Sequence, residues 1–532
     1  MPRLPAVVTA VIVGLGLLSA PAATGATEPV ETRGISWSAC RDAELASYGL
    51  QCGALEVPLD HASSEGTKIK LALTRRPHTS SLASYQGVIL TNPGGPGASG
   101  RSLASLGDYV PGGAGDSYDW IGFDPRGVGA STPSLRCSRT YFGVNRPSYV
   151  PTRARHYSYW LSKNRAYANA CADTAAERSL LAHMSTSDSV HDMEAIRLAL
   201  GVEKLNYYGF SYGTYLGQLY ATRHPGRVGR FVLDGVVDAG RVWYAANLDQ
   251  NRAFDRNMNV FWRYLARRPG HFRLGTTAGA VRRTYYRTLR SLDRRPAAAG
   301  RLGPSELADV MLEAGYYVYD WPGLGEDFSR LVRRRQGGAL FARYRESQMG
   351  DDNSFAVYNA VQCTDQVWPG WARTKRDAQR LHRVAPFLTW GNTWFNAPCL
   401  YWRAPGKRPA AVTGRAVTAK MLLISETLDA ATPYAGARRT RARFPSASLV
   451  AGIGGTTHSS SFSGVACVDN AVAAYLRTGR VPARVAGAGP DRRCPKVQPP
   501  LSAGLGARTT GAVDRLPAAL RRDLVAAQQS GH

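Results

Sequence analysis

The stretch Tyr207-Tyr208-Gly209-Phe210-Ser211-Tyr212-Gly213-Thr214 predicts the fold of this chain. It contains a Gly-x-Ser-x-Gly motif between a short apolar run typical of a strand, 205–208, and a run of small and apolar residues typical of a helix, 215–222. A sharp strand-to-helix turn lifts the serine out of the sheet, and the two glycines leave room where side chains would clash. Ser211 is therefore the candidate nucleophile. Because the motif also occurs by chance, the prediction depends on finding partners for this serine.

A serine nucleophile needs a histidine base and an acid that orients it, and in α/β-hydrolases the chain order is serine, acid, histidine. Five of the ten histidines follow Ser211. His458 is the candidate base because it follows an apolar run and a flexible Gly-Gly-Thr-Thr loop, whereas the others lie at a helix end, in Arg-rich stretches or at the last position. A loop histidine without a role is the alternative.

The candidate acid is Asp429, which comes soon after the predicted buried strand 421–425. Parallel sheets place their chemistry at the carboxyl ends of strands. Glu426 is the competing carboxylate, and a plain helix-capping role is the alternative for Asp429.

An oxyanion hole is expected on the loop after an early strand, and the loop 92–97, Asn-Pro-Gly-Gly-Pro-Gly, follows the predicted strand 87–91. Glycines allow backbone N–H groups to approach a developing oxyanion. The expected donors are the N–H of Tyr212 and that of Gly94 or Gly95. An ordinary Gly/Pro turn is the alternative.

Four sequence blocks then carry a resemblance to a known family: 92–97, 119–127, 206–220 and 232–236. Occurring in this order, they resemble the secreted α/β-hydrolase aminopeptidases of the tripeptidyl aminopeptidase type, relatives of the prolyl aminopeptidases. The segment 421–494 is similar to that family's closing segment, with Asp429 and His458 at the expected places. Two positions depart from many relatives, since Pro93 and Thr457 stand where those have His and Gly.

The resemblance implies an α/β-hydrolase fold, a mostly parallel sheet flanked by helices, with a helical lid insertion. It implies a serine peptidase that takes peptides with a free N-terminus and releases short N-terminal peptides, expected to be tripeptides. Three alternatives stay open: an esterase or other acyl hydrolase on the same triad, a single-residue, prolyl-type aminopeptidase, and a non-catalytic binding protein. No metal or organic cofactor is expected, and the oligomeric state is not predicted.

Changes in residue pattern along the chain predict its organisation. Residues 241–405 are rich in helix-like runs, namely 245–268, 279–294 and 305–319, whereas strand patterns dominate before and after them. The expected parts are a signal peptide (1–26), the first part of the core (27–240), the lid (241–405), the second part of the core (406–500) and a flexible tail (501–532).

An aminopeptidase must bind an α-ammonium group, so carboxylates are expected to face the pocket from the lid. Asp365 is the first candidate because it lies two residues after Cys363, and Glu313 is the second. The alternative for each is a surface salt bridge with one of the many arginines. Outside the lid, Asp124 with Arg126, and likewise Asp234 and Asp238, are expected to form buried ion pairs that hold loops.

The N-terminus and the cysteines indicate an exported protein. Residues 1–26 combine Arg3, an apolar run too short for a membrane span and small residues at two plausible cleavage sites, with no cysteine for a lipid anchor. An uncleaved anchor is the alternative. An even number of cysteines in an exported chain indicates four disulfides, and eight cysteines allow 105 pairings. We expect sequential pairing: Cys40–Cys52, Cys137–Cys171, Cys363–Cys399 and Cys467–Cys494.

The net charge of +27 raises the question of nucleic-acid binding. Only eight of the 66 basic residues are lysines, and the arginines are spread along the chain without a recognisable nucleic-acid module. We therefore expect no nucleic-acid partner and no stable membrane insertion, and at most an attraction to an anionic cell wall.

Overall fold

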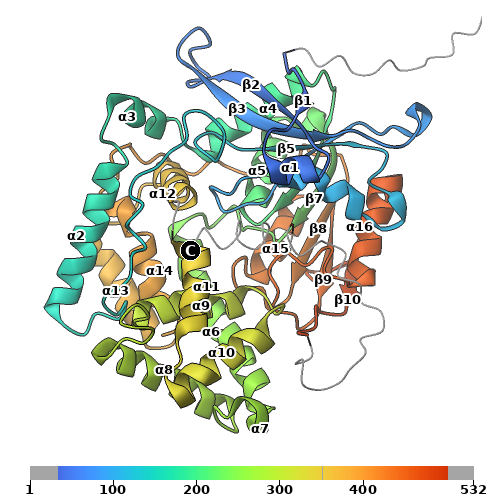
Figure 1. Ribbon diagram of the computed structural model, residues 1–532. Helices are drawn as coiled ribbons and strands as arrows, with labels where there is room; N and C mark the ends of the chain where they lie inside the picture. Colours follow the sequence, from blue (N-terminus) through green and yellow to red (C-terminus); the bar gives the residue numbers. More distant parts are fainter. Residues whose placement is uncertain (1–33, 350–351, 501–519, 521–532) are drawn as a thin grey trace, which may run out of the picture.

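A ten-stranded sheet forms the centre of the computed structural model, which describes residues 34–349, 352–500 and 520 (Figure 1). The strand order is β1-β2-β3-β5-β4-β6-β7-β8-β9-β10. The strands from β5 to β10 along this order are parallel, and β1, β2 and β3 continue the sheet in antiparallel fashion. The bounds are β1 Ser38–Ala39, β2 Gln51–Pro58, β3 Lys68–Arg76, β4 Val88–Asn92, β5 Asp119–Phe123, β6 Leu205–Phe210, β7 Val228–Asp234, β8 Met421–Glu426, β9 Ala447–Gly452 and β10 Arg492–Cys494.

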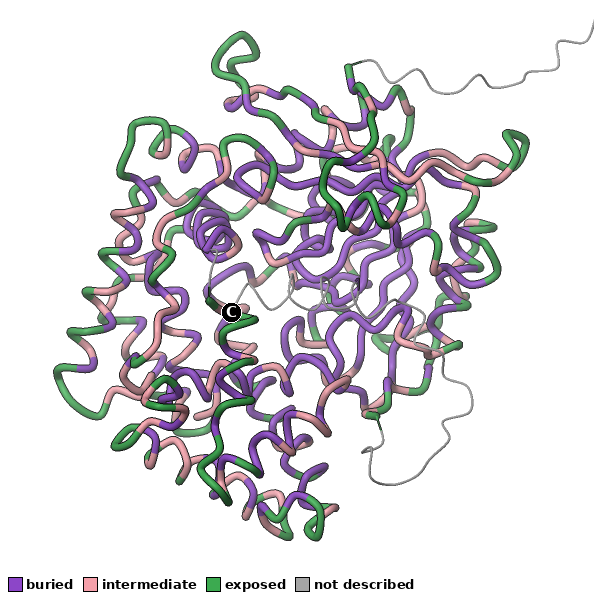
Figure 2. Tube along the Cα trace, in the orientation of Figure 1, coloured by how far each residue is buried: buried purple, intermediate pink, exposed green. Residues whose placement is uncertain are grey.

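Helices cover both faces of this sheet because successive side chains of a strand point to opposite faces. Tyr207 of β6 belongs to a core shared with Ile196 of α4 and Leu216 of α5, whereas the neighbouring Tyr208 packs in a second core with Val472 of α16. The core helices are α1 Ala43–Ser47, α4 Thr186–Ala199, α5 Tyr212–Arg223, α15 Tyr434–Arg443 and α16 Ala466–Thr478. Figure 2 shows the central strands as buried along their length. The architecture is the α/β-hydrolase fold that the sequence predicts.

A large helical lid lies beside the core and has hydrophobic clusters of its own, one of them around Phe261, Trp262 and Tyr285 (Figure 1). Its helices between β7 and β8 are α6 Tyr244–Ala266, α7 Pro269–Phe272, α8 Ala278–Arg294, α9 Pro304–Tyr316, α10 Trp321–Arg334, α11 Gly338–Gln348, α12 Asn353–Asp365, α13 Trp371–His382 and α14 Thr389–Phe395.

Two helices that precede the nucleophile strand lie on the lid side, α2 Ala154–Ala170 and α3 Ala175–Ala182 (Figure 1). Trp160 of α2 stacks on Trp394 of α14, with ring centroids 6.1 Å apart. The helical part of the molecule therefore draws on residues well before position 241.

Short 3₁₀ helices connect several of these elements; their bounds are Leu82–Ser84, Arg101–Tyr109, Pro111–Gly113, Pro225–Arg227 and Ala397–Leu400.

Four disulfides link the sequential pairs Cys40–Cys52, Cys137–Cys171, Cys363–Cys399 and Cys467–Cys494, as expected. The last of them joins α16 to the edge strand β10, and the third lies within the lid.

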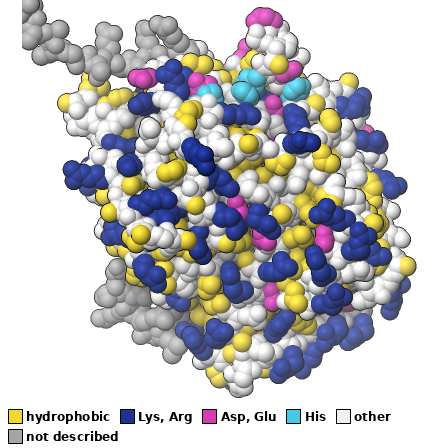
Figure 3. All heavy atoms as spheres, turned by 180° about the vertical axis from the view of Figure 1, so that it is seen from behind, with side chains coloured by type: hydrophobic (Ala, Val, Ile, Leu, Met, Phe, Trp, Pro, Cys, Tyr) yellow, Lys and Arg dark blue, Asp and Glu magenta, His cyan; other side chains and the backbone are white. Residues whose placement is uncertain are grey.

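The basic residues are spread over the face drawn in Figure 3 rather than gathered in one stripe. Among the described helices, none is long and apolar enough to cross a membrane. The expected signal peptide and most of the expected tail lie outside the described residues.

Candidate active site

Ser211 occupies the sharp turn between β6 and α5 that the motif predicts. Its φ of 51° is in the left-handed region, which a side-chain-bearing residue seldom adopts. The glycines permit this turn, since a Cβ at Gly209 would lie 2.6 Å from the carbonyl oxygen of Gly213, and a Cβ at Gly213 would lie 2.8 Å from that of Asn92. The local sequence thus folds so as to present Ser211 at the carboxyl end of a central strand.

Asp429 and His458 form a buried pair after β8 and β9. Oδ2 of Asp429 lies 2.8 Å from Nδ1 of His458. Asp429 is held in turn by Thr432, whose N–H donates to Oδ1 at 3.0 Å and whose hydroxyl donates to Oδ2 at 2.9 Å. Nε2 of His458 is buried, and no residue in the described part of the chain hydrogen-bonds to it. A carboxylate on Nδ1 leaves Nε2 as the nitrogen able to take a proton.

The end of β7 joins the serine to the histidine loop. The carbonyl oxygen of Asp234 accepts from the N–H of Ser211 at 2.9 Å and from the hydroxyl of Ser459 at 3.3 Å. The next residue is Gly235, and a Cβ there would lie 2.8 Å from Cε1 of His458. The approach of the histidine ring therefore depends on a glycine at position 235.

Two buried carboxyl groups hold the loop that carries His458. Glu426 accepts the N–H of Thr457 at 2.6 Å, and its other oxygen accepts the N–H of Val497 at 2.7 Å. On the other side, Asp234 accepts the N–H groups of Ser460 and Ser461 at 3.1 and 2.8 Å.

Burial raises the pKa of both groups, Glu426 to about 8 and Asp234 to about 6. The side chain of Asp234 thus braces this loop through hydrogen bonds, where the sequence suggested an ion pair.

The glycine loop after β4 lies against the serine. Gly94 has a φ of 102°, and a Cβ on it would lie 2.8 Å from Cβ of Ser211 and 3.0 Å from the nitrogen of Tyr212. The N–H of Gly94 donates to the side-chain oxygen of Asn92 at 3.0 Å. Gly95 lines the same cavity as Ser211 and Tyr212. Of the two glycines expected to supply a donor, Gly95 is therefore the one facing the cavity, while Gly94 provides the close approach.

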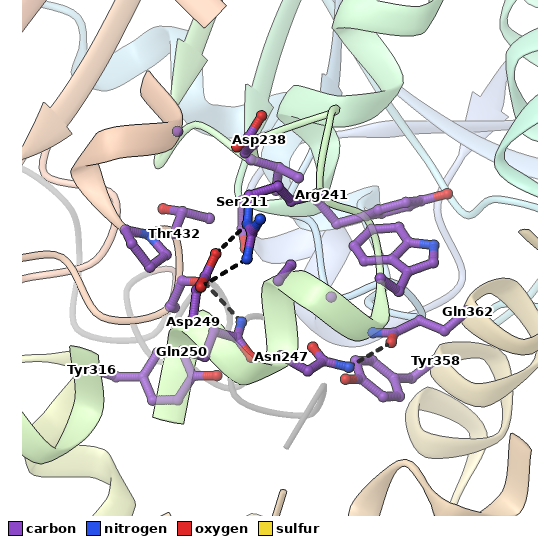
Figure 4. Close-up of a pocket in the computed structure, with 18 of the residues that line it drawn as sticks. Ser211, Asp238, Arg241, Asn247, Asp249, Gln250, Tyr316, Tyr358, Gln362 and Thr432 are labelled. Atoms are coloured by element: carbon purple, nitrogen blue, oxygen red, sulfur yellow. Dashed lines mark hydrogen bonds and ion pairs between the residues drawn. The ribbon is translucent and has the colours of Figure 1, made fainter. Parts of the chain in front are cut away.

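A cavity opens beside Ser211, between the core and the lid (Figure 4). Its wall includes the aromatic side chains of Tyr212, Trp243, Tyr316 and Tyr358. Figure 4 shows Arg241 and Asp249 joined by two dashed lines, with Asn247, Tyr358 and Gln362 on another part of the wall. A mainly apolar cavity with a few polar groups is typical of a small-molecule or peptide site.

Comparison with known proteins places this site in a family. The chain is 36% identical over 465 residues to the tripeptidyl aminopeptidase of Streptomyces lividans, covering 85% of this chain and 86% of that protein. The chain belongs to the tripeptidyl aminopeptidase family. Residues 385–494 match the family model described as TAP-like protein, a segment that includes Asp429 and His458.

The serine protease Hip1 of Mycobacterium tuberculosis is 30% identical to this chain, and the alignment covers 86% of this chain and 91% of Hip1. Carboxylesterase B of the same organism is 32% identical, and the alignment covers 87% of this chain and 94% of that protein. The protein is a serine hydrolase of the α/β-hydrolase type, and the tripeptidyl aminopeptidase and serine protease relatives support a serine peptidase.

Asp365, the first sequence candidate for the ammonium site, lies behind the cavity wall. Its carboxylate accepts from the N–H and the hydroxyl of Thr186, at 2.7 and 2.5 Å, and from Nε1 of Trp243 at 2.9 Å. With three donors already on it, Asp365 fixes Trp243, which does line the cavity. Burial raises its pKa to about 6.

Glu313, the second sequence candidate, lies on α9 with an oxygen 3.8 Å from Arg343. Neither it nor Asp365 is among the described residues that line the cavity.

Asp124 and Arg126 are both buried, but each pairs with other residues instead of forming the expected ion pair with the other. Asp124 accepts from Ser99 and Gly100 and lies 3.2 Å from Arg101, whereas Arg126 makes a bidentate pair with Asp192. Neither residue is among the described residues that line the cavity.

Sequence reasoning missed the polar residues that α6 contributes to the cavity. Asn247, Asp249 and Gln250 line it, together with the apolar Ala246. The signal that could have found them is helical spacing at the start of the first lid helix, since 246, 249 and 250 lie on one helix face. The segment 235–243 connects α6 to β7, the strand next to β6 in the sheet, and the first turns of α6 line the same cavity as Ser211.

Proposed function

We propose that this protein is a secreted serine peptidase that removes tripeptides from the free N-terminus of peptide substrates. The observation that carries the proposal is the buried Asp429–His458 pair. Nε2 of His458 has no hydrogen-bond partner among the described residues, and Ser459, the next residue of the loop, donates to the same carbonyl oxygen as the N–H of Ser211. The tripeptide unit rests on the relative of that name.

In the proposed reaction, Oγ of Ser211 attacks the scissile carbonyl carbon while Nε2 of His458 takes its proton. Asp429 keeps the proton on Nδ1 and stabilises the imidazolium that forms. The backbone N–H groups of Tyr212 and Gly95 stabilise the oxyanion. His458 returns the proton to the leaving amine, and water then hydrolyses the acyl-enzyme by the reverse sequence of proton transfers.

Secretion is proposed from the leader-like residues 1–26 together with the four disulfides, which persist in oxidising compartments. Comparing the N-terminus of the protein recovered from the culture medium with that of the full chain tests this part.

Digestion of a free decapeptide beside its N-acetylated twin, followed by mass spectrometry, tests the peptidase function. We expect successive loss of three-residue units from the free peptide, with the acetylated twin intact. Release of single residues would replace the tripeptide assignment by a prolyl-type aminopeptidase, and cleavage of both twins would remove the requirement for a free N-terminus.

An esterase is the second candidate, favoured by the similarity to carboxylesterase B. An oxyanion loop of glycines serves esters as well as amides. Hydrolysis of a p-nitrophenyl ester without hydrolysis of any tripeptide p-nitroanilide would make this the function.

A further inference from the structure

An ion pair at the cavity wall joins the lid to the segment that enters it. Arg241 precedes α6, and Asp249 lies on α6. The guanidinium of Arg241 donates to both carboxylate oxygens of Asp249, from Nε and from Nη2, the latter at 3.0 Å. Both side chains line the cavity that contains Ser211 (Figure 4).

Of the described residues that line the cavity, two carry carboxylates, and they differ in how firmly they are held. Asp238 is largely buried, with one oxygen 2.6 Å from Arg439 and the other 3.7 Å from Arg443. Asp249 keeps 31% of its side chain exposed, and its ion-pair partner, Arg241, keeps 41%. Asp249 thus presents a more exposed carboxylate with one arginine on it, whereas Asp238 has two, so Asp249 can exchange its cation more readily than Asp238 can.

A second acceptor lies next to Asp249 in the chain. Nε2 of Gln250 donates to the carbonyl oxygen of Ala431 at 2.8 Å, which orients the amide. Its Oε1 is buried and accepts no hydrogen bond from any described residue, although Gln250 lines the cavity. A buried acceptor without a donor is costly, and a donor brought by a ligand would remove that cost.

An α-ammonium group carries one positive charge and three N–H donors. A carboxylate with a replaceable cation, beside an amide oxygen without a donor, matches that group. We propose that Asp249 and Gln250 bind the N-terminal ammonium of the substrate, and that Arg241 occupies the Asp249 carboxylate until the substrate replaces it. This inference rests on the proposed aminopeptidase function and names the part of the cavity that recognises the free N-terminus.

Arg241 and Asp249 therefore act in opposite directions. Loss of the Asp249 charge removes the partner of the ammonium, whereas loss of the Arg241 charge removes the competitor of the ammonium. If Arg241 instead bound an acidic group of the substrate, loss of the Arg241 charge would weaken substrate binding.

The test compares two tripeptide p-nitroanilides that differ only in the N-terminal amine, one with the free amine and one with hydrogen in its place. The measured quantity is the ratio of kcat/KM for the free amine to kcat/KM for the des-amino twin. This ratio cancels any loss of folded enzyme, because both substrates report on the same folded fraction.

We expect Asp249→Asn to lower this ratio by about tenfold to a hundredfold, as for loss of a hydrogen bond to a charged group, and Gln250→Met to lower it by about fivefold to tenfold. Arg241→Gln should raise the ratio by about twofold to fivefold, in line with the small contribution of an exposed ion pair. The matched control is Asp320→Asn, which removes another half-exposed, Arg-paired lid carboxylate, outside the residues that line the cavity.

A wild-type ratio near one would end the proposed aminopeptidase function itself. A high wild-type ratio that Asp249→Asn leaves unchanged would overturn the Asp249 site alone. A fall of the ratio in Arg241→Gln would overturn the exchange of cations on Asp249.

Discussion

In the proposed mechanism Asp429 acts through His458, and its hydrogen bonds with Thr432 allow the effect of the Asp429 charge to be separated from the effect of one hydrogen bond. Asp429→Asn keeps the size of the side chain but removes the charge that stabilises the imidazolium. We expect kcat to fall by roughly 10³- to 10⁴-fold, as for loss of the acid in other triads. Steady-state hydrolysis of a tripeptide p-nitroanilide measures this.

Thr432→Val is a milder change at the same site, because it removes one hydrogen bond to Oδ2 of Asp429 and keeps the charge. We expect it to lower kcat by about tenfold or less, in line with the loss of one hydrogen bond to a charged group. Equal losses in the two variants would contradict a role for the Asp429 charge beyond holding the loop.

Glu426 makes stability depend on pH. Burial raises its pKa from an ordinary 4.5 to about 8, so the folded protein binds this proton more tightly than the unfolded chain does. The stabilisation is complete below about pH 4.5 and is lost as the pH rises through about 8. We therefore expect the free energy of unfolding to decrease across this window by an amount on the order of a few kcal/mol.

Glu426→Gln cannot titrate and should flatten this dependence, which thermal unfolding over the same pH range measures. Glu65→Gln, at an exposed turn, is the matched control and should keep the wild-type slope. Parallel curves for wild type and Glu426→Gln would contradict the assignment of the effect to Glu426.

The histidine loop leaves no room for a side chain at Gly455. A Cβ there would overlap the carboxyl group of Glu426, which holds the N–H of Thr457. Gly455→Ala should therefore displace the loop, lowering the melting temperature and kcat together, with a destabilisation of about 2 kcal/mol or more. Gly226→Ala, where a Cβ would meet nothing within 4 Å, is the control for the substitution itself. Unchanged kcat in Gly455→Ala would contradict the account of this loop.

Elements with strong local signals could be predicted from the sequence. The helices expected at 245–268 and 279–294 are observed as Tyr244–Ala266 and Ala278–Arg294, because hydrophobic periodicity is a local property. The strand expected at 421–425 is observed as Met421–Glu426.

Features that depend on contacts between distant segments could not be predicted from the sequence. The attachment of α2 to the lid rests on aromatic packing between residues about 230 positions apart, Trp160 and Trp394. The carboxylate of Asp234 accepts a hydrogen bond from a loop that folds over β7 from far along the chain. The carboxylate of Asp365 accepts hydrogen bonds from Trp243 and Thr186, which are also distant in sequence. Residue type and spacing carry no information about these partners.

At the scale of the whole molecule, a tryptophan cluster fastens α2 to α13 and α14. Trp394 is fully buried, its ring lies 5.2 Å from that of Trp371 and 5.5 Å from that of Trp390, and its Nε1 donates to the carbonyl oxygen of Tyr149. We expect Trp394→Ala to destabilise this part of the lid by about 3–5 kcal/mol. Hydrogen exchange should rise first in α2 and α14, with the central strands still protected.

The control for that variant is Val384→Ala, whose side chain is exposed and should leave exchange unchanged. Simultaneous exchange of lid and sheet in Trp394→Ala would show that the two parts unfold as one unit.

We propose that Ser211 is the nucleophile and that His458 activates it. Labelling with a fluorophosphonate, followed by peptide mapping, identifies the nucleophile. We expect one adduct, on Ser211, that is absent from Ser211→Ala and forms roughly a hundredfold more slowly, or slower still, in His458→Ala. An adduct on another serine, or undiminished peptide hydrolysis by Ser211→Ala, would show that the assignment of Ser211 is wrong.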